Sequence, residues 1–287
     1  MAIQASRVFH MHLVSDSTGE TLAAIAKAVG VQYPNVRAIE HMHALVRTQR
    51  QLKRVLGAVE KEPGIVLYTV VNKALGEELE QYCKELKVPC HAVLQPIMQI
   101  FEGYLGAPRT PTVAGQHVLD ADYFRRIDAM NFTMHHDDGR LPENLSDADI
   151  IVLGISRTSK TPTSIYLAQR GYKTANLPLV PQVPLPGRLT QPHSAFVVCL
   201  IANADRIAEV RRNRAALLAD RDMETYVDWE TIAAEIAYTR RIAAKYGWPV
   251  IDVTRRSIEE SASMILKLLH DRGEAAPSDA DAGHRHG

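Results

Sequence analysis

The stretch IVLGISRTSKTPTSIYLA, residues 151–168, decides the fold of the second half of the chain. An apolar run ends at Gly154, and a cluster of Ser, Thr and Lys residues then leads into a segment of helical character. Pro162 stands near the first turn of that segment, where proline is favoured because its missing N–H needs no partner. The stretch therefore predicts a strand, a tight polar loop and a helix.

The same strand-then-helix order continues on both sides of this stretch. Strands are predicted at 7–14, 36–42, 65–71, 90–94, 148–154, 173–180, 195–202 and 248–254. Segments with helical spacing of apolar residues lie between most of them. This alternation predicts an α/β fold with mainly parallel sheets covered by helices, and no repeat at a fixed period is visible.

The length of 287 residues exceeds that of a usual single domain. The alternation is interrupted between 107 and 146, so we expect two α/β units. They are an N-terminal α/β domain at 1–106, a connecting segment at 107–146 that contains HHDDG, a C-terminal P-loop-like nucleotide-binding domain at 147–272, and a disordered polar tail at 273–287.

The composition limits which kinds of binding partner and which cellular compartment are expected. Lys plus Arg and Asp plus Glu both total 33, so no net field favours nucleic acid or an anionic membrane. The three cysteines form no C-x-x-C pair, which favours a reducing compartment. No signal-peptide core and no apolar stretch of membrane-spanning length are visible. We therefore expect a cytoplasmic protein that binds neither nucleic acid nor membrane.

The polar loop of the opening stretch is typical of a phosphate site. The standard motif is G-x-x-x-x-G-K-[ST] between a strand and a helix, and here Gly154 is followed by four residues and then Ser159-Lys160-Thr161. Backbone N–H groups and the helix N-terminus attract phosphate oxygens, the lysine adds charge, and the hydroxyl can hold a metal ion or phosphate. Ser159 replaces the second glycine, so a left-handed backbone there costs more. The predicted nucleotide-binding residues are Gly154, Ile155, Ser156, Arg157, Thr158, Ser159, Lys160 and Thr161. An ordinary capped helix start with an exposed lysine is the alternative.

A second polar segment, SDSTGE, follows the first predicted strand and opens a helix. Its hydroxyls and N–H groups can form a site for inorganic phosphate or phosphothreonine. The residues concerned are Ser15, Asp16, Ser17, Thr18 and Gly19. The alternative is a capping box, with Ser17 as the cap and Glu20 three positions later.

Two further clusters carry candidate chemistry. In HHDDG, an aspartate can deprotonate an attacking hydroxyl or hold Mg²⁺ beside phosphates, and we select Asp137 for this role. The alternative is a solvated polar turn. Arginines in DRIAEVRRNR suit the binding of phosphate by several donors, with an exposed charged face as the alternative. They are Arg206, Arg211 and Arg214.

Four segments together resemble one known family. They are GISRTSKTPTSIYLAQRGYKTANLPLVP, HLVSDSTGETL, HHDDG and WPVIDVTRRSIEE, in the family's order and spanning nearly the whole chain. The family is that of the bacterial pyruvate, phosphate dikinase regulatory proteins, whose H-D-D-G matches 136–139 and leaves His135 outside the motif. A sister branch that regulates phosphoenolpyruvate synthase usually has Cys-Gly before the loop lysine. Thr158-Ser159 at that place favours the dikinase branch.

The resemblance implies a bifunctional enzyme with ADP and inorganic phosphate as substrates. One activity phosphorylates an active-site threonine of the dikinase from ADP, and the other removes that phosphate with inorganic phosphate and releases pyrophosphate. Lys160 and Asp137 are then the catalytic candidates, the dikinase is the protein partner, and a homodimer is left open. The alternatives are the same chemistry on the synthase, a small-molecule P-loop kinase, and a nucleotide sensor without catalysis.

Overall fold

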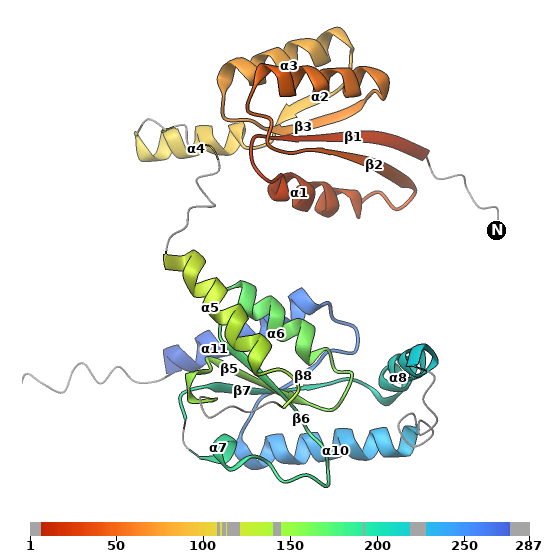
Figure 1. The fold of residues 1–287 in the computed structure, drawn as a ribbon, viewed down its shortest axis with the longest axis vertical. Helices are drawn as coiled ribbons and strands as arrows, with labels where there is room; N and C mark the ends of the chain where they lie inside the picture. The colour runs from red at the N-terminus through yellow and green to blue at the C-terminus, as the bar shows by residue number, and fades with distance from the viewer. Residues whose placement is uncertain are drawn as a thin grey trace, which may run out of the picture. The chain divides into compact units, whose positions relative to one another are not determined.

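The computed structural model describes residues 7–107, 110, 113, 121–139, 145–191, 193–218 and 228–275, with the backbone alone for 214–218 and 273–275. The chain divides into two compact units, Met1–Val118 and Leu119–Gly287. Each is built around a parallel four-stranded sheet flanked by helices (Figure 1). The predicted α/β class and parallel sheets are therefore confirmed.

The N-terminal unit alternates strictly between strands and helices. Its elements are β1 (Arg7–Ser15), α1 (Glu20–Gly30), β2 (Val36–His43), α2 (Gln49–Lys61), β3 (Gly64–Thr69), α3 (Lys73–Glu85), β4 (Cys90–Ala92) and α4 (Gln95–Leu105). The helix α2 begins with a complete capping box between Thr48 and Gln51, which explains why it starts where it does.

The C-terminal unit begins with a helix and then resumes the alternation. Its elements are α5 (Ala121–His135), η2 (Leu145–Asp147), β5 (Ile150–Gly154), α6 (Lys160–Gln169), β6 (Thr174–Pro178), α7 (Gly187–Thr190), β7 (Phe196–Ile201), α8 (Ala204–Leu218), α10 (Trp229–Tyr246), β8 (Val250–Asp252) and α11 (Ile258–Ala275). No helix in the described part of the chain has both the length and the apolar character needed to cross a membrane.

The two sheets have the same topology. Their strand orders are β2-β1-β3-β4 and β6-β5-β7-β8, all parallel. In each, the first strand lies inside the sheet, the second strand pairs on one side of it and the third on the other. The chain therefore reverses its direction of winding between β1 and β3, and again between β5 and β7. In open α/β sheets, ligands bind at such points, outside the carboxyl ends of the strands.

Apolar residues on both faces of each sheet form the cores. Leu13 of β1 packs with Leu22 on the α1 side, whereas Val14 packs with the buried residues of α2 and α3 on the opposite side. In the second unit, Ile150 and Val152 of β5 belong to the core under α6 and α11. The intervening residues 151 and 153 face the core that includes residues of α7 and α10. Residues 150–153 of β5 are all fully buried, as expected for a central parallel strand.

Two helices extend beyond the expected limits. Within the connecting segment, DADYFRRIDAM at 120–130 predicts a helix, and the observed helix continues to His135 because Phe132 and Thr133 keep the helical spacing of buried residues begun at Ala129. The first histidine of HHDDG is therefore helical. The last helix, α11, begins at the capping box of Ser257 and Glu260 and runs to Ala275. The rest of the predicted disordered tail, 276–287, lies outside the described residues.

Gly64 tests how closely β1 and β3 must approach. A Cβ at Gly64 would lie 2.0 Å from the carbonyl oxygen of His10, so the backbone of β1 would have to move. We expect Gly64→Ala to lower the free energy of unfolding by about 1–3 kcal/mol or more, as overpacking does. Gly57→Ala is the matched control, because nothing lies within 4 Å of its Cβ position and the residue is helical. Gly57→Ala should raise the free energy of unfolding by about 0.5–1 kcal/mol. Urea unfolding followed by circular dichroism measures both, and equal effects would contradict the close approach.

Candidate functional site

The loop between β5 and α6 leaves the sheet at a glycine that no other residue can replace without displacement. Gly154 has φ 153°, and a Cβ there would lie 2.4 Å from the carbonyl oxygen of Leu200 in β7. It would also lie 2.9 Å from the Thr158 hydroxyl. The first glycine of the predicted phosphate motif is thus required by the close approach of the loop to β7.

The loop enters α6 through a left-handed residue followed by a helical one, a backbone pairing that can bind anions. Arg157 and Ser159 are left-handed, with φ 72° and 59°, whereas Thr158 and Lys160 are not among the residues with positive φ. Alternating left- and right-handed residues point successive N–H groups toward one side of the chain. Ser159 therefore takes the conformation for which the standard motif uses glycine, at a cost of about 1–2 kcal/mol.

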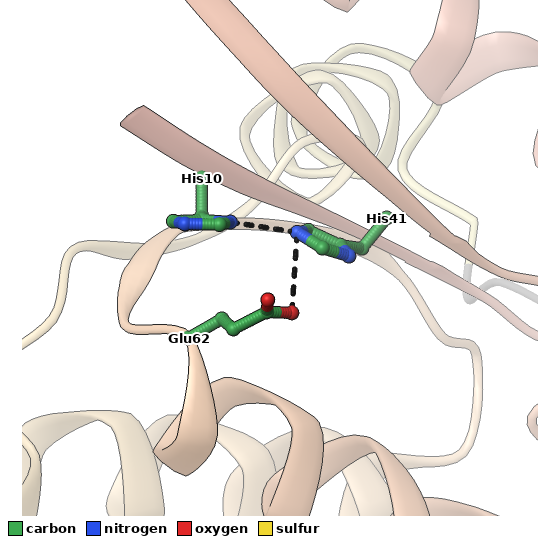
Figure 2. Close-up of side chains that lie close together, drawn as sticks. All are labelled: His10, His41 and Glu62. Atoms are coloured by element: carbon green, nitrogen blue, oxygen red, sulfur yellow. Dashed lines mark hydrogen bonds and ion pairs between the residues drawn. The ribbon is translucent and has the colours of Figure 1, made fainter. Parts of the chain in front are cut away.

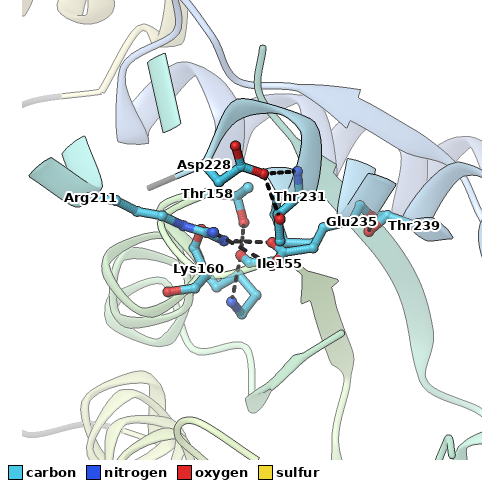
Figure 3. A network of polar contacts seen from close by, with 9 residues as sticks. Ile155, Thr158, Lys160, Arg211, Asp228, Thr231, Glu235 and Thr239 are labelled. Carbon is cyan, nitrogen blue, oxygen red and sulfur yellow. Dashed lines mark hydrogen bonds and ion pairs between the residues drawn. The ribbon is translucent and has the colours of Figure 1, made fainter. Parts of the chain in front are cut away.

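Lys160 is buried inside the loop rather than exposed at its surface. Its side chain is 6% exposed, and Nζ donates a hydrogen bond of 3.0 Å to the Ile155 carbonyl oxygen. The Thr158 hydroxyl donates to the same carbonyl at 2.9 Å (Figure 3). Burial lowers the pKa of Lys160 to about 8, against a partial rise from the nearby Asp138 carboxylate. Ser159 forms no side-chain cap bond, so the alternative of a capped start with an exposed lysine is wrong.

Asp137 lies at the same end of α6 and contacts the loop directly. Its Oδ1 accepts a hydrogen bond of 2.8 Å from the Thr161 hydroxyl and a second one from Nδ2 of Asn176 in β6. The Asn176 side-chain oxygen in turn accepts from the backbone N–H of Asp138 at 3.1 Å. Both members of the predicted catalytic pair therefore lie at the start of α6, Lys160 as its first residue and Asp137 through its bond to Thr161.

Backbone pairing with β6 fixes the rest of HHDDG. Asn176 donates from its backbone N–H to the His136 carbonyl, and its own carbonyl accepts from Gly139, both at 3.1 Å. His136 is buried, its Nδ1 bonds the Phe132 carbonyl at 2.7 Å, and its ring stacks on Phe132. His135 is exposed on α5. His136 therefore helps to hold the segment in place, and Asp137 contacts the loop.

The three candidate arginines have different surroundings. Arg211 is 1% exposed and pairs with Glu235 of α10 at 2.6 Å (Figure 3). It also donates to the Ser156 carbonyl at 3.4 Å. Arg206 forms an exposed ion pair with Glu209 on the same helix. The side chain of Arg214 lies outside the described part of the structure. Of the two described side chains, only Arg211 reaches the loop.

The SDSTGE segment lies in the other unit, at the corresponding strand end. Ser15 Oγ accepts hydrogen bonds of 3.1 Å from the Ser17 N–H and from the Thr69 hydroxyl of β3. Asp16 accepts from the Val71 N–H at 2.7 Å. The segment is therefore tied to the end of β3, at the point where the winding reverses.

The predicted capping box at Ser17 is wrong. Helix α1 begins one residue after Gly19, which is left-handed with φ 85°, and no side chain caps it. A pocket of about 460 Å³ opens beside this helix start. Its lining includes Ser15, Asp16, Ser17, Gly19, Thr69 and Lys73. This pocket belongs to the N-terminal unit, whereas the 154–161 loop belongs to the C-terminal unit.

The sequence did not indicate two residues that contact these polar segments. Asn176 orients Asp137 and the following N–H, yet it lies inside a predicted strand with no motif of its own. Arg47 donates from Nε to the Asp16 carbonyl at 2.7 Å, from a position 31 residues later in the chain. Only the parallel pairing of the strands brings these residues to the loops.

The Arg211–Glu235 pair gives a test of how the loop is supported. Glu235→Gln should lower the free energy of unfolding by about 3 kcal/mol, because Arg211 would keep its charge in a buried place without this carboxylate. Glu209→Gln is the matched control, since the Arg206–Glu209 pair on the same helix is exposed and worth less than about 1 kcal/mol. Chemical denaturation measures both. Equal losses would mean that Arg211 does not depend on Glu235.

Comparison with known proteins agrees with the four sequence segments. The kinase/pyrophosphorylase family matches residues 11–266. A protein of Chelativorans sp. (strain BNC1) is 55% identical over 260 residues, covering 91% of this chain and 96% of its own. A protein of Bradyrhizobium diazoefficiens is 52% identical over 276 residues, covering 96% and 99%. Both are named provisionally as pyruvate, phosphate dikinase regulatory proteins. These matches confirm the resemblance, and the chain belongs to the kinase/pyrophosphorylase family.

Proposed function

We propose that this protein regulates pyruvate, phosphate dikinase by phosphoryl transfer in both directions. In one direction it phosphorylates an active-site threonine of the dikinase from ADP, and in the other it removes that phosphate with inorganic phosphate. The family and the names of the relatives support this assignment. The observation that carries it is the buried Lys160 beside Asp137 and Thr161, at the start of α6.

In the kinase direction, the 154–161 loop binds the phosphates of ADP. The threonine oxygen of the dikinase attacks the β-phosphorus, the bond to the bridging oxygen breaks, and AMP leaves. Lys160 neutralises the charge that develops on the phosphoryl oxygens, and the loop N–H groups contribute in the same way. Asp137 accepts the threonine proton or orients a metal ion.

In the phosphorylase direction, inorganic phosphate is the nucleophile. One of its oxygens attacks the phosphorus of phosphothreonine, a P–O–P bond forms, and the threonine oxygen leaves and takes up a proton. We propose that the pocket beside SDSTGE holds the inorganic phosphate, because its helix start has no side-chain cap and Lys73 lines it. Arg47, which already reaches the Asp16 carbonyl, is a further donor near this anion.

The residues present fit a magnesium ion. The Asp137 carboxylate and the Thr161 hydroxyl lie 2.8 Å apart and offer the hard oxygen ligands that Mg²⁺ prefers beside phosphates. When bound, the ion would neutralise phosphate charge during transfer. Thr161 and Asp137 would hold it, and Asn176 would keep the carboxylate oriented.

Labelled nucleotides test this function directly. The protein is incubated with pyruvate, phosphate dikinase and either ADP labelled in the β-phosphate or ATP labelled in the γ-phosphate. We expect label on a dikinase threonine from ADP alone, and release of labelled pyrophosphate when inorganic phosphate is then added. Label on a small molecule would support a metabolite kinase, and nucleotide binding without transfer would support a sensor. Label on phosphoenolpyruvate synthase instead would reassign the target.

In this assay Lys160→Met should lower kcat/KM by about 10²–10³-fold, the usual effect of losing one donor to the transition state. The melting temperature should not fall, because burial of the charged lysine is itself unfavourable. Lys267→Met, an exposed lysine of α11 in the same unit, is the matched control and should retain full activity. Full activity of the Lys160 variant would refute the assignment of the loop.

Proton uptake gives an independent test of the loop. The pKa of Lys160 is lowered to about 8 from 10.5, so above about pH 8 the free protein has lost this proton. Bound phosphates would raise the pKa again, because they favour the charged form. At about pH 9, ADP binding should therefore take up close to one proton, and well below pH 8 almost none. Calorimetry in two buffers of different ionisation enthalpy measures this. Lys160→Arg, which stays charged, should show no uptake, and equal uptake in both proteins would exclude Lys160 as its source.

A further inference from the structure

A cluster of histidines lies on one face of the N-terminal sheet and includes no residue of the two loops described above. His10 and His12 alternate along β1, and His41 and His43 alternate along the paired strand β2. His12 stacks on both His41 and His43, with ring centroids 4.7 and 5.4 Å apart. Glu62, directly after α2, approaches the same group (Figure 2). None of these residues has a role in the proposed phosphoryl transfer.

Three side chains of this cluster converge on one point. His10 Nδ1 lies 2.9 Å from His41 Nε2, and His41 Nε2 lies 3.7 Å from Glu62 Oε2. One ligand atom from each residue lies within 4.8 Å of the other two. Ligand atoms about 2.0–2.1 Å from a tetrahedral zinc ion are separated from one another by about 3.3 Å. The separations of 2.9 and 3.7 Å lie on either side of that value. Small side-chain rotations would therefore bring the ligand atoms to the spacing that a zinc ion needs.

The surroundings hold the three groups in position. His12 is fully buried, and its Nε2 donates a hydrogen bond of 2.8 Å to the Glu62 carbonyl oxygen, which fixes the backbone of the carboxylate residue. His43 Nε2 lies 3.1 Å from His12 Nδ1 and is the donor there, because His12 carries its proton on Nε2. Gly64 allows β3 to start directly against His10. Such supporting contacts are typical of metal sites.

We propose that His10, His41 and Glu62 form a binding site for a transition-metal dication of the zinc type. Two neutral imidazoles and one carboxylate are a common ligand set for Zn²⁺, with water in the fourth position. To bind, His10 would carry its proton on Nε2 and His41 on Nδ1, so that both facing nitrogens offer lone pairs. Imidazole ligands disfavour Mg²⁺, which separates this site from the phosphate loop.

The site would act on the fold of the N-terminal unit. Its ligands come from β1, from β2 and from the turn between α2 and β3, so one ion would join three elements. His41 and Glu62 are partly exposed, at 22% and 41% of their side chains, which leaves room for entry of the ion. A bound metal stabilises the folded state because the unfolded chain has no such site.

Cobalt spectroscopy and zinc calorimetry on the full chain, prepared without a histidine tag, test the proposal. His284→Ala/His286→Ala is used as the background, so that the two histidines near the C-terminus contribute no binding. We expect one Co²⁺ per chain with the visible absorption typical of a four-coordinate site, displaced by Zn²⁺ and not by Mg²⁺. Zinc should also raise the melting temperature.

His41→Ala and Glu62→Gln should each weaken zinc binding by at least about tenfold. His91→Ala, an exposed histidine of β4 outside the cluster, is the matched control and should bind zinc as the background does. Circular dichroism of each variant in chelator shows whether it is folded. Glu62→Gln keeps the shape of the side chain and serves if His41→Ala fails to fold. No stoichiometric binding to the background protein, or binding unchanged in Glu62→Gln, would mean that the cluster is a hydrogen-bonded histidine group only.

Discussion

The hydrogen bond from the Thr161 hydroxyl to the Asp137 carboxylate joins the two segments on which the proposed chemistry depends. One segment follows β5 and carries Lys160, and the other follows α5 and carries the aspartates. They are 24 residues apart in the chain, and Asn176 of β6 binds the second segment through both its side chain and its backbone. A buried cation, a hydroxyl and a carboxylate therefore meet at the start of one helix. Each member is held by hydrogen bonds within the protein, as the proposed electrostatic catalysis requires.

The two units share one sheet topology. Both have four parallel strands in the order second-first-third-fourth, and in both a polar loop follows the first strand where the winding reverses. Gly19 and Gly154 stand at these loops with positive φ, one directly before its helix and one directly at the strand end. Under the proposed function, each unit offers one such loop to a phosphate-bearing ligand. The shared topology does not show as a sequence repeat, because the order of the strands does not require the same side chains in both units.

The sequence predicted the strands and helices well because long periodic segments report burial directly. It also identified the 154–161 loop, since its motif depends on local spacing, and it selected Asp137, which proved to contact that loop. It missed Asn176, a polar residue inside a buried strand. It assigned a cap to Ser17 because pattern alone does not reveal that the helix starts after Gly19. The histidine cluster was missed for a related reason: His10 and His41 meet only once the register of β1 against β2 is known.

The central claim is that nucleotide and inorganic phosphate bind at different loops in different units. Calorimetric titration of ADP and of inorganic phosphate into the wild type, Ser17→Ala/Thr18→Ala and Lys160→Met tests it most directly. The account predicts that the double variant binds inorganic phosphate about tenfold more weakly, as expected for one or two lost hydrogen bonds, and binds ADP within about twofold of the wild type. Lys160→Met should show the opposite pattern. Equal weakening of both ligands by either variant would contradict the account, because it would mean that one site binds both.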